Sequence, residues 1–102
     1  MKTTDEVLAL LRQALPRLQA TYPIRSLALV GSYARGEQTP QSDVDLIVEL
    51  APGAGMGFIY LAQELEALLG LPVDLISAGG IKPTYQPSFW ADAIHVLSYA
   101  PA

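Results

Sequence analysis

Three aspartates stand at the start of apolar runs, where a buried strand would leave carboxylates at its end. Asp43 and Asp45 open the run DVDLIVEL, and Asp74 lies in VDLI. Side chains two apart on a strand point to the same side, so Asp43 and Asp45 are expected to project together. Close carboxylates repel one another unless a cation lies between them, and Mg²⁺ prefers one or two carboxylates plus phosphate oxygens and water. If the strands are neighbours, the three acids converge at one sheet edge and can hold two metal ions.

The segment GSYARG, ahead of the aspartates, has the residue types of a phosphate-binding turn. Gly31 lets the backbone approach a phosphate closely, and Ser32 offers a hydroxyl and an amide. Arg35 could add a positive charge over the phosphates. The G-x-x-x-x-G spacing of a P-loop is present at Gly31, but Glu and Gln follow where Lys and Ser or Thr are required. Tyr33 occupies the second glycine position of the dinucleotide fingerprint, so that alternative fails too.

The elements that must position these residues can be predicted from periodicity. Leucines at helical spacing predict a helix from about Thr4, kinked or ending near Leu15 because of Pro16, with a further turn to Gln19. A second amphipathic helix is expected over 58–69, capped by Gly70. Short apolar runs predict strands at 24–30, 42–50, 72–77 and 94–98, the last after a short helical turn. This order predicts an α/β (α+β) fold, a small mixed sheet flanked by helices.

Composition narrows the class of protein. The chain has 102 residues, which predicts a single domain over 1–102. A net charge of −4 argues against a broad nucleic-acid surface, but not against one phosphate ligand that arrives with metal ions. There is no cysteine, and no signal peptide or membrane-spanning run is recognisable, so a cytoplasmic protein is expected. Only 16% of residues are charged, which indicates either an apolar partner surface or a compositional bias toward Ala and Leu.

The Gly-Ser pair, the D-x-D motif and the later aspartate are more specific together than any of them is alone. A lone D-x-D is usually a solvated loop end. Here a Gly-Ser pair after a strand is followed, after ten residues, by D-x-D at the next strand and then by an aspartate in a later strand. This pattern resembles the nucleotidyltransferase superfamily, which includes DNA polymerase beta and the kanamycin nucleotidyltransferases. The closer resemblance is to the minimal nucleotidyltransferases (the MNT type), through LVGSYARGEQTPQSDVDLIVEL and LEALLGLPVDLIS. It covers roughly Leu8 to Ser77 and is looser in the tail from Gly79.

The resemblance implies roles for individual residues. Gly31 and Ser32 would hold the triphosphate of the nucleotide, with Arg35 as a further phosphate contact. Asp43 and Asp45 would bind Mg²⁺, with two ions expected. Asp74 would be the third carboxylate, helping to hold a metal and able to take the acceptor's proton.

The resemblance also implies a partner and an activity. Minimal nucleotidyltransferases are typically encoded beside a small all-helical HEPN-class protein, often an RNase toxin, and act as its antitoxin by moving AMP from ATP to a tyrosine. The expected protein is therefore a Mg²⁺-dependent protein adenylyltransferase. Two alternatives stay open: a non-catalytic antitoxin that neutralises its partner by stoichiometric contact, and an antibiotic-type adenylyltransferase, which the short chain disfavours. No residue can be assigned to the base, so the nucleotide itself is not fixed.

Overall fold

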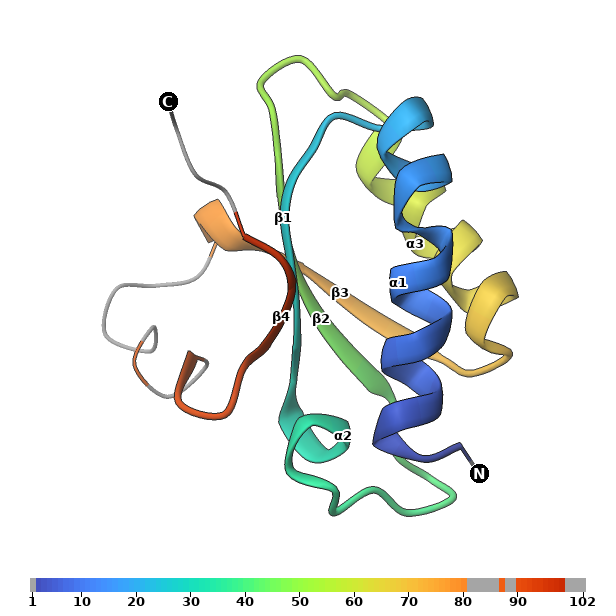
Figure 1. The fold of residues 1–102 in the computed structure, drawn as a ribbon. Helices are drawn as coiled ribbons and strands as arrows, with labels where there is room; N and C mark the ends of the chain where they lie inside the picture. Colours follow the sequence, from blue (N-terminus) through green and yellow to red (C-terminus); the bar gives the residue numbers. More distant parts are fainter. Residues whose placement is uncertain (1, 81–86, 88–89, 99–102) are drawn as a thin grey trace.

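A four-stranded mixed sheet with helices on one face forms the framework of the protein (Figure 1). The computed structural model describes residues 2–80, 87 and 90–98. The elements follow in the order α1 (Thr4–Thr21), β1 (Ile24–Val30), α2 (Gly31–Arg35), β2 (Val44–Leu50), α3 (Gly57–Leu69), β3 (Val73–Ser77), the 3-10 turn η1 (Ala78–Gly80) and β4 (Ile94–Leu97). The predicted α+β class is confirmed.

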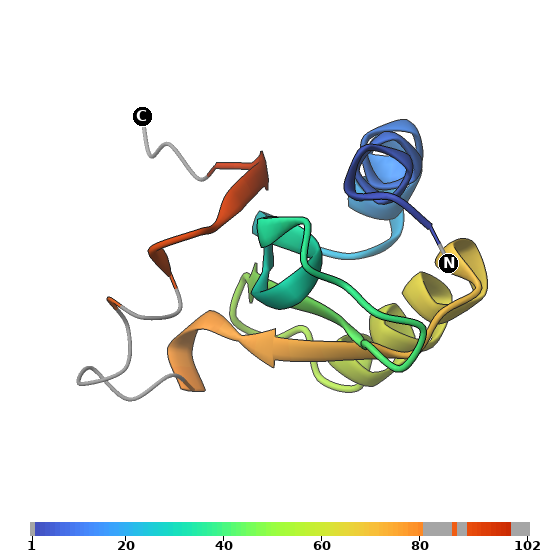
Figure 2. The same ribbon diagram turned by 90° about the horizontal axis from the view of Figure 1, so that it is seen from below.

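The strand order β3-β2-β1-β4 decides which ends of the strands meet. β1 runs antiparallel to both β2 and β4, while β2 and β3 are parallel and joined through α3. The end of β1 therefore lies beside the start of β2, and the start of β3 lies at the same end of the sheet. Figure 2 looks onto this end of the molecule, with α2 in the middle and β3 and β4 at the two edges of the sheet.

The two faces of the sheet are covered differently. Alternate residues of β1 and β2 pack against α1 and α3 and form the main core with Leu11, Leu61 and Leu65, all fully buried. On the opposite face, Val30 and Ile47 are buried beneath a smaller apolar set that includes Ile76, Ala78, Trp90 and Ala93. Because side chains alternate along a strand, Asp45 falls on this second face, between core residues that point to the helices.

Helix α1 is longer than the sequence predicted. We expected a kink or an end near Leu15, with a further turn to Gln19, and the helix does not end there but runs through Pro16 to Thr21. Proline removes one backbone hydrogen bond. Beyond it, Leu18 is buried in the core, and the Tyr22 N–H donates to the Leu18 carbonyl at 2.8 Å. Tertiary burial of the last turn thus outweighs the local penalty.

The other boundaries agree to within about two residues. β2 begins at Val44 rather than Ser42, so Asp43 lies just outside the strand. Part of the helical turn expected ahead of β4, at Ser88 and Phe89, lies outside the described residues. Large apolar side chains are exposed at the start of α3: Met56, Ile59 and Tyr60. No helix in the described part of the chain is long and apolar enough to cross a bilayer.

Candidate active site

The turn from β1 into α2 is built by a glycine and a buried tyrosine. Gly31 has φ +74°, a left-handed conformation that residues with a side chain rarely adopt. Tyr33 is only 1% exposed and anchors the short helix in the core. The Thr4 hydroxyl, at the start of α1, donates to the Tyr33 carbonyl at 2.5 Å. Gly36, also left-handed, ends α2. The turn is therefore held by the core and by α1, not by its own short helix.

Asp45 and Asp74 face each other across two parallel strands. They are register partners between β2 and β3, so their side chains point to the same face of the sheet. Neighbouring strands lie about 4.8 Å apart, a spacing at which one bound group can contact both carboxylates. The predicted convergence of acids at one edge of the sheet is thus realised for this pair.

Gly31 and Asp45 are packed against each other directly. A Cβ atom at Gly31 would collide with the Asp45 Oδ2 atom. The antiparallel register, in which Val30 is the partner of Asp45, creates this approach. Glycine is required here twice over, for its backbone conformation and for the room it leaves to the carboxylate.

These residues surround one pocket of about 360 Å³. Gly31 and Arg35 come from α2, Asp45 from β2 and Asp74 from β3. The other described residues that line the pocket, which the sequence did not single out, are Val30, Ile76 and Asp92. The pocket falls in the size range of small-ligand sites, about 300–1,000 Å³. It has an apolar wall and a strongly acidic one.

The electrostatics of the pocket are unfavourable for ionised Asp45. Partial burial raises the pKa of its carboxyl, and the negative charges of Asp74 and Asp43 raise it further. The positive charge of Arg35 opposes them. A site that holds acids close together at such a cost is suited to a cation.

Arg35 is held between two other acids. Its Nε atom donates to Glu37 Oε1 at 2.9 Å, and its Nη1 atom lies 4.0 Å from Asp92 Oδ2. The side chain is 43% exposed. The guanidinium therefore stands at the pocket with hydrogen-bonding capacity to spare, because it carries five N–H donors.

Two predicted residues are not among those that line the pocket. Ser32 follows Gly31 in α2, and its carbonyl accepts the Glu37 N–H at 2.9 Å. Asp43 is exposed in the segment before β2, near enough for its charge to act on Asp45. Their roles stay predictions.

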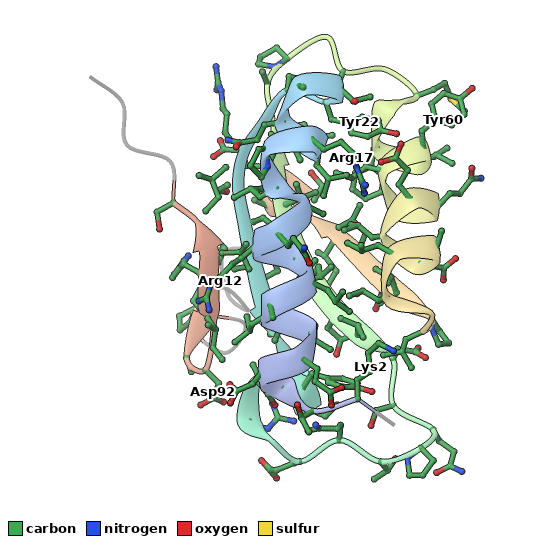
Figure 3. All side chains as sticks on the ribbon, turned by 45° about the vertical axis from the view of Figure 1, so that its right-hand side comes forward. Lys2, Arg12, Arg17, Tyr22, Tyr60 and Asp92 are labelled. Carbon is green, nitrogen blue, oxygen red and sulfur yellow. The ribbon has the colours of Figure 1, made fainter. Side chains whose placement is uncertain are left out.

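Asp92 is the charged residue, among the described residues that line the pocket, that the sequence analysis missed. It precedes β4 by two residues, and β4 pairs with β1 so that Ile94 lies opposite Leu29. This pairing brings Asp92 to the α2 end of the sheet, as Figure 3 shows. One signal was available, because Asp92 repeats the pattern of Asp43 and Asp74, an acid at the start of an apolar strand.

The side chains fit Mg²⁺ only as part of a larger ligand set. Among the described residues, no three acidic or histidine side chains are grouped closely enough to hold a metal ion by themselves. Asp45 and Asp74 form a pair at the pocket, and Mg²⁺ is commonly bound by one or two carboxylates together with phosphate oxygens and water. The arrangement therefore suits a metal that arrives with a phosphate ligand.

Comparison with known proteins identifies the family. The model of the nucleotidyltransferase domain family matches residues 11–97. The chain belongs to the nucleotidyltransferase family. The match includes all the described residues that line the pocket, together with β4 and most of α1.

Individual relatives refine this assignment. A protein of Methanocaldococcus jannaschii named as a candidate protein adenylyltransferase is 42% identical over 100 residues, covering 94% of this chain and all of its own length. A solved structure described as a candidate minimal nucleotidyltransferase superposes with a TM-score of 0.77 at 33% identity, covering 91% of this chain and 95% of the other. The predicted resemblance to minimal nucleotidyltransferases is confirmed.

A third comparison shows the fold alone. A tri-AMPylated HEPN toxin of Shewanella oneidensis has been solved in complex with an MNT antitoxin. The matching chain has a TM-score of 0.65 at 20% identity and covers 89% of this chain and 72% of that one.

Proposed function

We propose that this nucleotidyltransferase moves AMP from ATP to a tyrosine hydroxyl of a small all-helical HEPN-class toxin, and so acts as its antitoxin. The observation that carries the proposal is the in-register pair Asp45 and Asp74, lining one pocket with Gly31 and Arg35. Those four residues combine acids for a metal, a backbone that a phosphate can approach, and a cation.

The chemistry assigned to the pocket is an in-line displacement at the α-phosphorus of ATP. The tyrosine oxygen forms a bond to this phosphorus, and the bond from the phosphorus to the pyrophosphate oxygen breaks. The phenolic proton passes to the Asp74 carboxylate, which is exposed and therefore accessible to an acceptor. The products are AMP-tyrosine and pyrophosphate. Catalysis of this kind depends mainly on positioning and charge.

Asp45 and Asp74 would hold Mg²⁺, with Asp43 close by for a second ion. Bound Mg²⁺ would neutralise phosphate charge on the nucleotide and so relieve the repulsion that now raises the pKa of Asp45. Arg35 would contact the phosphates from α2, and the Gly31–Ser32 backbone would lie against them. Each of these roles belongs to the chain's own residues and can be tested singly.

The partner is supported by the comparisons and by the size of the chain. The Methanocaldococcus relative carries the name of a protein adenylyltransferase, and the Shewanella complex pairs an MNT antitoxin with an AMPylated HEPN toxin. The pocket is formed by the sheet edge and one short helix, which leaves little protein to shape a separate acceptor site. A helical partner would supply the acceptor and the remaining wall.

The deciding experiment combines the purified protein, a HEPN-class protein from the same organism as candidate partner, Mg²⁺ and ATP labelled at the α-phosphate. We expect label on a toxin tyrosine, located by mass spectrometry, and none with the Asp45→Asn variant. Absence of transfer from any nucleotide would contradict the proposal. If an Asp43→Asn/Asp45→Asn double variant still neutralised the toxin in cells, stoichiometric contact without catalysis would replace it.

A further inference from the structure

The ion pair between Arg35 and Asp92 joins two parts of the chain that are far apart in sequence. Arg35 ends α2, whereas Asp92 lies in the segment that leads into β4. Both line the pocket, and their charged atoms are 4.0 Å apart. Of the acids that line the pocket within the described part of the chain, Asp45 and Asp74 lie in β2 and β3, and Asp92 comes from outside these strands.

The guanidinium of Arg35 is contacted at two different nitrogens. Glu37 accepts from Nε, and Asp92 approaches Nη1. A planar fork held at two points has a defined orientation, which a single contact to a flexible side chain does not give. The Glu37 contact is local, two residues away along the chain, and does not tie Arg35 to another element. The Asp92 contact draws the side chain toward the pocket.

We propose that Asp92 is a positioning residue, which orients Arg35 so that its free N–H groups face a triphosphate in the pocket. The proposal rests on the proposed phosphate-binding role of Arg35. Asp92 itself touches neither the nucleotide nor the reacting atoms. Its negative charge would make it a poor phosphate ligand, and its effect passes through Arg35.

The expected effect of losing the Arg35–Asp92 ion pair depends on how exposed the two side chains are. The Asp92 side chain is 53% exposed and that of Arg35 43%, so the pair is screened by water. Ion pairs of this kind contribute between a few tenths and about 1 kcal/mol. Losing the pair should therefore weaken binding of a triphosphate by about two- to fivefold, with a larger loss when Arg35 itself is removed.

The test measures binding and turnover separately in the full-length protein. Affinity for Mg²⁺-tripolyphosphate is measured by calorimetry for wild type, Asp92→Asn, Arg35→Ala and the double variant. We expect Asp92→Asn to weaken binding about two- to fivefold, Asp92→Glu to restore part of it, and the effect to vanish in the Arg35→Ala background. In turnover, KM for ATP should rise while kcat changes little. Glu49→Gln is the control, because it removes one negative charge at the far end of β2.

Three outcomes would overturn the inference. They are unchanged or tighter binding by Asp92→Asn, an equal loss in the Arg35→Ala background, or no binding of Mg²⁺-tripolyphosphate by the wild type. The proposed function fails separately, if the wild type binds the probe with the expected Asp92 effect but transfers no AMP to a protein. The first of these outcomes, combined with a change in melting temperature, would show that Asp92 has a structural role only.

Discussion

At the scale of single residues, Gly31 is the glycine with the least room for a side chain. Its backbone is left-handed, and a Cβ would collide with Asp45 Oδ2. We expect Gly31→Ala to cost about 1–2 kcal/mol for the backbone alone, and to displace the carboxylate and remove most activity. Urea unfolding and AMP transfer measure the two effects. Gly36→Ala is the control, because its φ is also positive but a Cβ there would meet nothing. Equal activity in both variants would contradict this prediction.

Ionised Asp45 is expected to lower the free energy of unfolding of the metal-free protein, although the proposed reaction needs this carboxylate. Burial and the neighbouring acids raise its pKa, so the metal-free folded protein holds the proton more tightly than the unfolded chain does. Stability from this group is therefore present at low pH and is lost as pH rises through the raised pKa. Asp45→Asn should abolish transfer yet raise the melting temperature at pH 7 in EDTA. A shift of about 4–8 °C corresponds to each kcal/mol in a domain of this size.

The pH dependence of the Asp45→Asn variant tests whether the carboxylate charge causes the expected difference in stability. The difference between Asp45→Asn and wild type should shrink toward pH 3, where the carboxyl is protonated in both states. A variant that is less stable than wild type at pH 7 without metal would show that Asp45 is compensated by contacts of its own.

At the scale of elements, the start of α1 is fixed by a capping box. The Thr3 hydroxyl accepts the Glu6 N–H at 3.1 Å, and the Glu6 carboxylate accepts the Thr3 N–H at 3.0 Å. We expect Thr3→Ala to cost about 1 kcal/mol of unfolding free energy. Because Thr4 ties this turn to Tyr33 in α2, the variant should also lower the affinity for nucleotide. Chemical denaturation and calorimetry measure the two effects.

The capping box also predicts a pH dependence. Hydrogen bonds from Thr3 lower the pKa of Glu6 in the folded protein. Its contribution to stability is therefore present above the unfolded value of 4.5 and is lost as pH falls through the lowered folded pKa. The stability difference between wild type and Glu6→Gln should be constant from pH 7 to pH 5 and close at lower pH. A difference that grows on acidification would contradict the assigned hydrogen bonds.

Most helices and strands could be predicted from the sequence, whereas the end of α1 and the place of Asp92 could not. Apolar periodicity predicts both long helices and all four strands, because each buries one stripe or face. Pro16 led us to expect an end of α1 near Leu15 or Gln19, earlier than Thr21, since the packing of Leu18 outweighs the local effect of the proline. Asp74 could be predicted as part of the site from its place at the start of a strand. Asp92 also precedes an apolar strand, but its approach to the pocket depends on β4 pairing with β1, a contact between distant parts of the sequence.

At the scale of the whole molecule, the pocket carries an excess of negative charge, which a bound cation would compensate. Among the described residues that line it, Asp45, Asp74 and Asp92 carry negative charge and Arg35 carries positive charge. ATP alone would meet repulsion, and Mg²⁺ alone would find an incomplete set of ligands. The two together should bind far better than either separately, because each supplies the charge that the other lacks.

Thermal unfolding tests this coupling. A ligand at one hundred times its Kd stabilises a folded protein by about 2.7 kcal/mol, which for a domain of this size raises Tm by about 10 °C or more. We expect such a shift with Mg²⁺ and a non-hydrolysable ATP analogue together, and only small shifts with each alone. In Asp45→Asn the joint shift should be lost. If the analogue stabilised the protein equally well in EDTA, the acids of the pocket would not act through a metal, and Asp45 and Asp74 would need another role.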